Sequence, residues 1–310
     1  NAILGNFPGN LYDENVELTM ALVWSRIEQL AWVVAALSII AYSFDVPTYR
    51  TSMAPRPVQR PRLAIVLAIV AIAGGLRLRT WSGDLGYAVD AEDIQEALGG
   101  HIETEHFVIH YAKVPELEEI IGLVAEDHEF RYSQVVAQLG VAASRKIHSY
   151  YFSDREQKAR WMGARDVEMA KPWRHEIYLE HRGWPHGSLR HEIAHAVASE
   201  FGDPMFGVAA RRVAGIPVMF QPGLIEGLAV AVDWPGGSYE RMTPHELVRV
   251  LQQLGKAPTI GSLLTMQFFS LSSQTSYTTA GSFLKYLLDT YGAKPLRALC
   301  FTHNPTGTWT

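Results

Sequence analysis

Two histidines four residues apart, with a glutamate directly after the first, form the segment His191-Glu192-Ile193-Ala194-His195. On a helix, positions i and i+4 lie on one face about one turn apart, so both imidazoles can bind a single ion. Glu192 lies at the edge of that face, from where it can reach a metal-bound water molecule without being a ligand. These residue types at this spacing predict metal-assisted hydrolysis, with zinc as the metal and Glu192 as the general base.

The flanking residues predict the helix that this spacing requires. Apolar residues recur near helical spacing from Leu189 to Phe201, Ser188 is placed to cap the N-terminus, and Gly202 is placed to end the helix. The motif alone has an alternative, a solvated helix face that carries two histidines. A third ligand decides between them, because catalytic zinc sites use three protein ligands and leave one position open.

A single carboxylate, Glu226, stands in the otherwise apolar segment 223–232. Burying this carboxylate without a partner would be costly, whereas a metal ion would compensate its charge. The small neighbours Gly227 and Ala229 would let two helices approach closely there. We therefore expect Glu226 to be the third ligand of one Zn²⁺ per chain. The alternative is a carboxylate at a helix start that faces water or caps backbone donors.

These two motifs resemble those of the gluzincin branch of zinc metallopeptidases, the MA-like peptidases whose third ligand is a downstream glutamate. The resemblance extends to Thr104–Tyr111 and to Tyr277–Leu287 followed by Tyr291-Gly292, so it covers about residues 100 to 300 and not the first 80. It implies peptide hydrolysis by an α+β catalytic domain of two lobes. A small mixed-sheet lobe would precede a helical lobe, with the metal between them.

The resemblance also concerns residues beyond the ligands. It implies that Tyr277 donates a hydrogen bond to the developing oxyanion, since a phenol stays protonated at neutral pH; the alternative is a packing tyrosine. Thermolysin-like members have an aspartate four residues after the glutamate ligand, where this chain has Val230, so we consider Asp233 as the partner of a ligand histidine. No Gly-Ala-Met-Glu-Asn-like element precedes His191, which favours an endopeptidase over an aminopeptidase.

The segment Trp173–Leu179 is expected to be an extended strand shortly before the active helix. In gluzincins such a strand lies at the cleft edge and pairs with the substrate backbone. His181 and His186 follow in a loop, where they either line the cleft mouth or lie at the surface. No other histidines repeat a ligand spacing with a carboxylate, so we expect no second metal site.

Hydrophobic periodicity places the other elements of the catalytic part. It predicts strands at His106–Tyr111 and Lys146–Phe152, and no strand after Ser188. The predicted helices are 115–139 closed by Gly140, 154–162 capped by Asp154, 189–201, 224–232, 244–254 with a capping box in Thr243-Pro244-His245-Glu246, and 278–290.

The first 80 residues have a different pattern. Residues 29–44 and 63–76 are uncharged and mostly apolar, and arginines flank the second stretch on both sides. We expect two transmembrane helices at about 27–45 and 61–78, the alternative for the second being a buried core helix. The predicted organisation is a membrane-anchoring region (1–80), a linker with a short acidic helix (81–99) and a zinc metallopeptidase domain (100–310).

The arginines also predict an orientation. The stretch between the two apolar segments is basic and the N-terminal flank is acidic, which places the stretch in the cytoplasm and the catalytic domain on the extracytoplasmic side. The residues concerned are Arg50, Arg56, Arg60 and Arg62 in the stretch and Asp13, Glu14 and Glu17 in the flank. Because Asn1 is not an initiator methionine, we expect the sequence to be a piece of a longer one.

Composition excludes other classes of protein. The net charge of −5 gives no basic surface for nucleic acid, so the expected partners are a peptide or protein substrate and membrane lipid. Cys300 is the one cysteine, so no intrachain disulfide can form. Charged residues near the motif, Arg190, Glu200 and Asp203, argue against an intramembrane protease. The alternative function is a zinc-containing membrane protein that binds or senses peptides without hydrolysing them, against which Glu192 argues.

Overall fold

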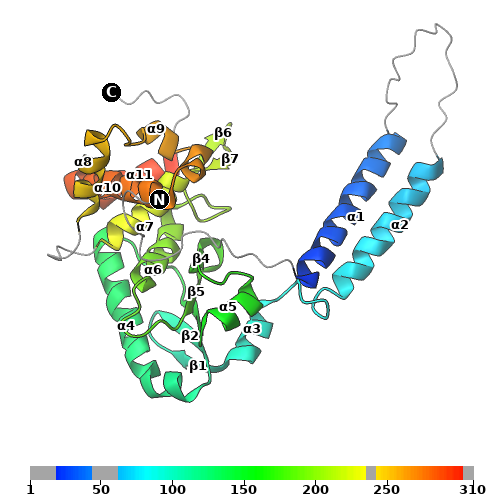
Figure 1. Ribbon diagram of the computed structural model, residues 1–310, viewed down its shortest axis with the longest axis horizontal. Coiled ribbons are helices and arrows are strands. Elements are labelled where there is room, and N and C mark those ends of the chain that lie inside the picture. Colours follow the sequence, from blue (N-terminus) through cyan, green and yellow to red (C-terminus); the bar gives the residue numbers. More distant parts are fainter. Residues whose placement is uncertain (1–18, 44–61, 235–241, 303–310) are drawn as a thin grey trace, which may run out of the picture. The chain divides into compact units, whose positions relative to one another are not determined.

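The computed structural model describes residues 19–43, 62–234 and 242–302 (Figure 1). These residues form a mixed α+β structure, which confirms the predicted class at that level. They divide into two compact units, one that ends at Asp93 and one that begins at Ile94. The charges from which we predicted the membrane orientation, apart from that of Arg62, lie outside the described residues.

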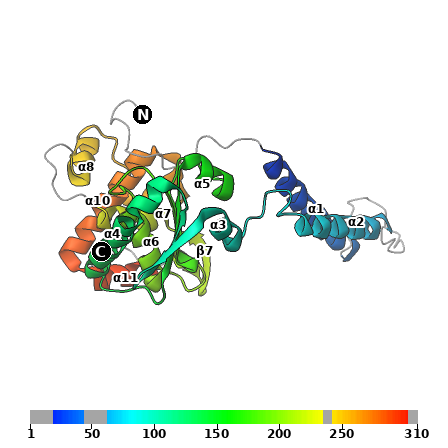
Figure 2. The same ribbon diagram turned by 90° about the horizontal axis from the view of Figure 1, so that it is seen from below.

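The first unit contains two long apolar helices, α1 (Met20–Ser43) and α2 (Arg62–Thr80), which lie side by side (Figure 2). Their 24 and 19 residues correspond to about 36 and 28 Å, against about 30 Å for a hydrocarbon core, so both are long and apolar enough to span a membrane. Helix α2 matches the predicted range 61–78 closely, whereas α1 begins seven residues before the predicted start at residue 27. Trp32 of α1 packs on Gly75 of α2.

The second unit is built on a five-stranded sheet whose strand order is β1-β2-β3-β5-β4. The three central strands are parallel, and the outer two run antiparallel to their neighbours. The strands are β1 (Gly99–Glu103), β2 (Phe107–Ala112), β3 (Ile147–Phe152), β4 (Met169–Lys171) and β5 (Glu176–Glu180). The strands predicted at His106–Tyr111 and Lys146–Phe152 are confirmed within a residue, whereas β1 and β4 were not predicted.

The segment that we expected to border a cleft lies inside the sheet. Residues 172–174 form a 3₁₀ turn and His175 has a left-handed backbone (φ 56°), so β5 starts only at Glu176. It pairs with β3 on one side and with β4 on the other, which leaves no edge for a substrate. The prediction that Trp173–Leu179 pairs with substrate is therefore wrong. The edge strand beside it is β4.

Helices cover both faces of this sheet. On one face, α4 (Pro115–Leu139) and α6 (Leu189–Ala198) bury Val135 and Ile193 completely. On the other face lie α3 (Ala91–Leu98) and α5 (Arg155–Met162). Gly140 ends α4 with φ 63° and the carboxylate of Asp154 caps α5, as predicted. Two residues of α3, Ile94 and Leu98, are buried, so the end of the predicted linker packs within this unit.

A hairpin and five helices follow α6. The hairpin, β6 (Ala210–Val213) and β7 (Ile216–Phe220), shows that the prediction of no strand after Ser188 was wrong. The helices are α7 (Pro222–Val232), α8 (Pro244–Gln253), α9 (Ile260–Leu263), α10 (Ser273–Tyr291) and α11 (Ala293–Thr302). The capping box from Thr243 to Glu246 is present, and α10 begins five residues before its predicted start at residue 278.

The buried His128 of α4 makes the stability of this unit dependent on pH. Its Nδ1 donates to the carbonyl of Val124 at 2.7 Å, its Nε2 accepts from the Ser149 hydroxyl at 2.9 Å, and burial lowers its pKa to about 4. The unfolded chain therefore binds this proton first as the pH falls below about 6.5. We expect the free energy of unfolding to drop by up to about 3 kcal/mol between pH 6.5 and pH 4.

Chemical denaturation of the full chain in detergent at pH 7, 5 and 4 measures this loss. The variant His128→Gln lacks the titrating group, so its free energy of unfolding should fall less steeply over the same range. An equally steep fall in the variant would show that other groups cause the acid sensitivity.

Candidate metal centre

Two helices bring the three predicted ligands together. α6 places His191 and His195 one turn apart, and α7 places Glu226 opposite them. The two Nε2 atoms are 3.1 Å apart, and Oε2 of Glu226 lies 3.5 Å from Nε2 of His191 and 3.4 Å from Nε2 of His195. Three side chains thus present one ligand atom each at the corners of a nearly equilateral triangle.

The size of this triangle fits a zinc ion. A tetrahedral ion with ligand distances of about 2.0–2.1 Å holds its ligand atoms about 3.3–3.4 Å apart, close to the three distances observed. Two imidazoles and one carboxylate are also the donor types of a catalytic site. Among the described residues no further histidine, cysteine or carboxylate joins the group, so the site offers three ligands and one open position.

The charge of Glu226 suits a ligand. Its side chain is mostly buried, with 23% of its surface exposed. Burial raises the pKa of this carboxyl, but the facing imidazoles of His195 and His191 outweigh burial and hold the pKa well below its usual range. The carboxylate is therefore ionised, as metal binding requires. A solvated carboxylate at a helix start, which was the alternative, does not describe its position.

Glu192 is buried beside the triangle, with 5% of its surface exposed. Burial raises its pKa to about 8; the nearby carboxylates of Glu168, Glu226 and Asp233 act in the same direction, and His191 acts against them. A carboxyl with this pKa is mostly protonated at neutral pH. The positive charge of a bound metal ion would lower the pKa and so favour the ionised form that a general base requires. Its position directly after His191 keeps it next to the ligands without making it one of them.

Tyr277 lies in an apolar cluster. Its ring is 5% exposed and packs against Phe268, 5.2 Å between centroids, with Leu263 and Ala280 in the same cluster. This environment is the one expected for a packing tyrosine. The oxyanion role that the resemblance implies for Tyr277 stays a prediction.

Asp233 binds an arginine beside the ligand helix. Its Oδ1 accepts from Nε of Arg190 at 3.2 Å, and the same guanidinium donates to the carbonyl of Trp234 at 3.0 Å and approaches Oε1 of Gln134 at 3.4 Å. Arg190 precedes His191, so these contacts tie α6 to the end of α7 and to α4. We considered Asp233 as the partner of a ligand histidine, whereas its hydrogen bond in the structure goes to Arg190. Nothing in the local sequence pattern connects positions 190 and 233.

One of the two loop histidines, His186, lies neither at a cleft mouth nor at the surface. His186 is 3% exposed and its Nε2 donates to the carbonyl of Glu180 at 2.9 Å, so it lines neither a cleft mouth nor the surface. His181 is partly buried beside the hydroxyl of Tyr151.

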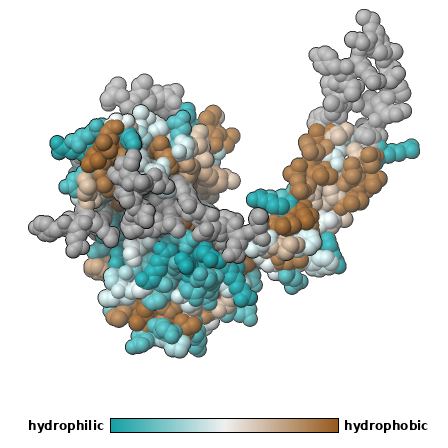
Figure 3. All heavy atoms as spheres, in the orientation of Figure 1, coloured by the Kyte–Doolittle hydropathy of each residue, from teal (hydrophilic) through white to brown (hydrophobic). Residues whose placement is uncertain are grey.

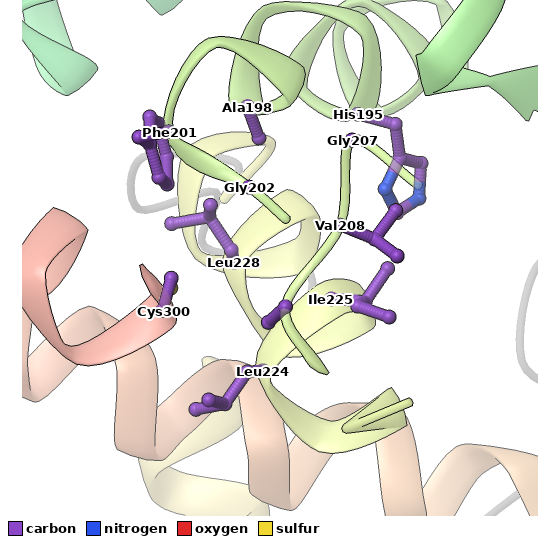
Figure 4. A pocket seen from close by; sticks show the side chains of 11 residues that line it. His195, Ala198, Phe201, Gly202, Gly207, Val208, Leu224, Ile225, Leu228 and Cys300 are labelled. Carbon is purple, nitrogen blue, oxygen red and sulfur yellow. The ribbon is translucent and has the colours of Figure 1, made fainter. Parts of the chain in front are cut away.

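A small apolar hollow adjoins the site at His195 (Figure 4). Figure 4 shows the imidazole on one side of it and Leu228 and Cys300 toward the other. Apolar walls beside a metal ligand keep the local dielectric low, which strengthens electrostatic interactions at the site.

Two helices that carry or support the site approach closely at Gly227. A Cβ atom there would lie 2.8 Å from the carbonyl oxygen of Ala280 in α10. This confirms the predicted role of a small residue beside Glu226, although the partner helix is α10 and not α6.

Gly227→Ala is therefore expected to destabilise the protein by up to about 2 kcal/mol, because overpacking costs about 1–3 kcal/mol and the gain in helix propensity offsets about 1 of it. Gly122→Ala in α4 is the matched control. No atom lies within 4 Å of the added Cβ there, so we expect a gain of up to about 1 kcal/mol. Denaturant titration of both variants measures the difference, and equal effects would contradict the close approach.

Side-chain geometry thus brings together the three residues that the two motifs indicated as ligands, His191, His195 and Glu226. Comparison with known proteins adds no name to this arrangement. The chain matches no model of a known protein family, and no curated protein matches it.

Proposed function

We propose that this chain is a membrane-anchored zinc peptidase of the gluzincin type that hydrolyses peptide bonds within chains. The observation that carries the proposal is the triangle of His191, His195 and Glu226, whose edges of 3.1 to 3.5 Å fit one zinc ion, with the buried Glu192 next to it. A site that only binds metal has no need of this fourth side chain.

A zinc ion held by the three ligands would act as a Lewis acid and lower the pKa of a water molecule toward about 7. Glu192 then accepts a proton from the attacking water and donates it to the leaving amine. Its place directly after His191 supports this role, because the side chain lies beside the ligands, and the charge of a metal ion there would lower its raised pKa toward neutral pH. The buried contacts of Arg190 hold α6, and with it both histidines, in place.

Strand β4 is the candidate position for the substrate backbone. It is an edge strand of the sheet, it runs antiparallel to β5, and it lies against α6. A peptide that added to its outer side would lie beside the helix that carries both histidines. The absence of an amine-binding element upstream of His191 favours internal cleavage over removal of N-terminal residues.

The helices α1 and α2 serve as the anchor in this proposal. Little of either helix is buried, which favours spans over core helices. The arginines of the stretch between them favour an extracytoplasmic position for the catalytic unit. A reporter fused after residue 100 is expected to be active outside the cytoplasm; activity inside would reverse this orientation.

Two measurements test the function itself. Metal analysis of the purified full chain should give about one zinc per chain. A peptide-library digest should show cleavage by the wild type and none by Glu192→Gln, and mass spectrometry of the products would identify the bonds cut. Zinc without cleavage of any peptide would instead favour a binding or sensor protein.

A further inference from the structure

The hairpin β6–β7 has an unusual distribution of apolar side chains. In a strand that is half buried, apolar residues face inward and polar residues face water. In β7 the exposed positions are Ile216, Val218 and Phe220, which alternate along one face, whereas the residues between them are partly buried. The outward face of this strand is thus apolar.

This face belongs to a larger apolar patch. The ring of Phe206 packs on Phe220, 5.0 Å between centroids, and Gly207 lies against the backbone of Trp173, so the hairpin is continuous with two neighbouring segments. The patch consists of Trp173, Met205, Val213, Ile216, Val218 and Phe220, which are between 46% and 70% exposed. Brown surface marks the hairpin in Figure 3, at the place of β6 and β7 in Figure 1.

The form of the patch argues against a groove for peptide. β6 and β7 form a sheet of their own, joined by Ala214 and Gly215 with φ of 51° and 80°, the tight turn of a two-residue hairpin. Small-molecule sites are concave and extended peptides add to strand edges, whereas the exposed apolar side chains here lie on the face of a hairpin and beside its turn. Isolated two-stranded hairpins are also only marginally stable in water, so a covering surface would stabilise this one.

If α1 and α2 span a membrane, the short connection after α2 keeps the catalytic unit near that membrane. The stretch from Trp81 to Asp93 has 13 residues, so it spans at most about 45 Å between α2 and the catalytic unit. The side chain of Arg211 is exposed on the same hairpin, which suits the anionic headgroups that often accompany such contacts. Trp173 adds the side-chain type that is enriched at membrane interfaces.

We propose that the patch around β6–β7 inserts into the surface of the lipid bilayer that α1 and α2 anchor. Ile216 and Val218 enter the boundary between headgroups and acyl chains, and Arg211 lies among the headgroups. Because the loop from Asp203 to Ala209 connects this hairpin to α6, insertion would hold the metal centre at a fixed height above the bilayer. The inference rests on the proposed anchoring, but not on peptidase activity.

Spin labels on the full chain test this inference. Cys300→Ala removes the one native cysteine, and single cysteines are then placed at Ile216, Val218, Val70 and Leu254 for nitroxide labelling. Val70 is an exposed position of α2, and Leu254 is an exposed apolar residue at the end of α8 that serves as the matched control in water. The protein is reconstituted in vesicles of phosphatidylcholine and phosphatidylglycerol, and relaxation by oxygen is compared with relaxation by a water-soluble nickel chelate.

The expected result is preferential relaxation by oxygen at Ile216, Val218 and Val70, and by the nickel chelate at Leu254. Oxygen preference at Val70 combined with nickel preference at both hairpin sites would overturn the insertion and leave the anchor intact. Nickel preference at Val70 would overturn the anchor, and the insertion with it.

Two other occupants of the patch would give different signals. Spin–spin broadening at Val218 that disappears on dilution with unlabelled protein would assign the patch to a second copy of the chain. Immobilisation of the label only when a casein digest is added would assign it to peptide. Either result in place of oxygen preference contradicts insertion.

Discussion

Glu192→Gln is expected to lower kcat for peptide hydrolysis by about 10²- to 10⁴-fold, the range that a positioned general base contributes, while the protein keeps its zinc. The side chain is 5% exposed, and an amide has nearly the shape of the carboxyl that it replaces, so the buried position should tolerate it. The amide cannot accept the proton of water. Activity should therefore disappear without loss of metal or fold.

Three measurements separate this role from a structural one. Zinc content and the melting temperature of Glu192→Gln should match those of the wild type, whereas kcat alone falls. Glu119→Gln, an exposed glutamate of α4, is the control and should leave all three quantities unchanged. If Glu192→Gln turned over peptide at the wild-type rate, Glu192 would not be the base, and another group would have to accept the proton of the attacking water.

Local sequence was sufficient to predict where helices begin and end. Helix α4 begins at Pro115 and ends where Gly140 takes a left-handed conformation, and Asp154 caps α5, as the residue types require. Each of these signals acts within one turn of helix. They need no knowledge of what the element packs against.

The elements that were missed depend on pairing or on unusual turns. The hairpin turn Ala214-Gly215 lacks the Asn-Gly or Asp-Gly pair typical of such turns, and Pro217 in β7 disfavours a strand, so nothing local indicated β6–β7. The place of β5 inside the sheet follows from its partners β3 and β4. Periodicity predicts that a segment is a strand, but not which strands lie beside it.

The same division holds for the candidate site. The spacing of His191 and His195 fixes their common face on one helix, and the isolated charge of Glu226 in an apolar run indicated the third ligand. The catalytic role predicted for Tyr277 had no such basis in spacing or charge, because it depended only on the resemblance of the surrounding segment to gluzincins. In the structure the ring of Tyr277 lies in an apolar cluster. The contact between Arg190 and Asp233 joins positions that are distant in sequence, which only the packing of α6 against α7 reveals.

Glu226→Ala is expected to reduce zinc affinity by at least about 100-fold and to abolish hydrolysis, because loss of even an outer partner of a ligand costs about 10- to 100-fold. The variant keeps two imidazoles 3.1 Å apart but has no anionic ligand. Glu226→Gln keeps the shape of the side chain and removes only its charge, so it should also bind zinc more weakly. Competition with a chromophoric chelator measures both affinities.

The melting temperature with and without zinc is a second test of Glu226 as a ligand, and it does not depend on activity. Zinc at 100 times its dissociation constant stabilises a folded protein by about 2.7 kcal/mol, so added zinc should raise the melting temperature of the wild type and not that of Glu226→Ala at the same concentration. Without metal, Glu226→Gln should be less stable than the wild type at pH 7, because the amide lacks the charge whose interaction with His195 and His191 lowers the pKa of the carboxyl. Equal stabilisation of Glu226→Ala and the wild type by zinc would show that the metal binds without this carboxylate, and the triangle of ligands would then be the wrong description of the site.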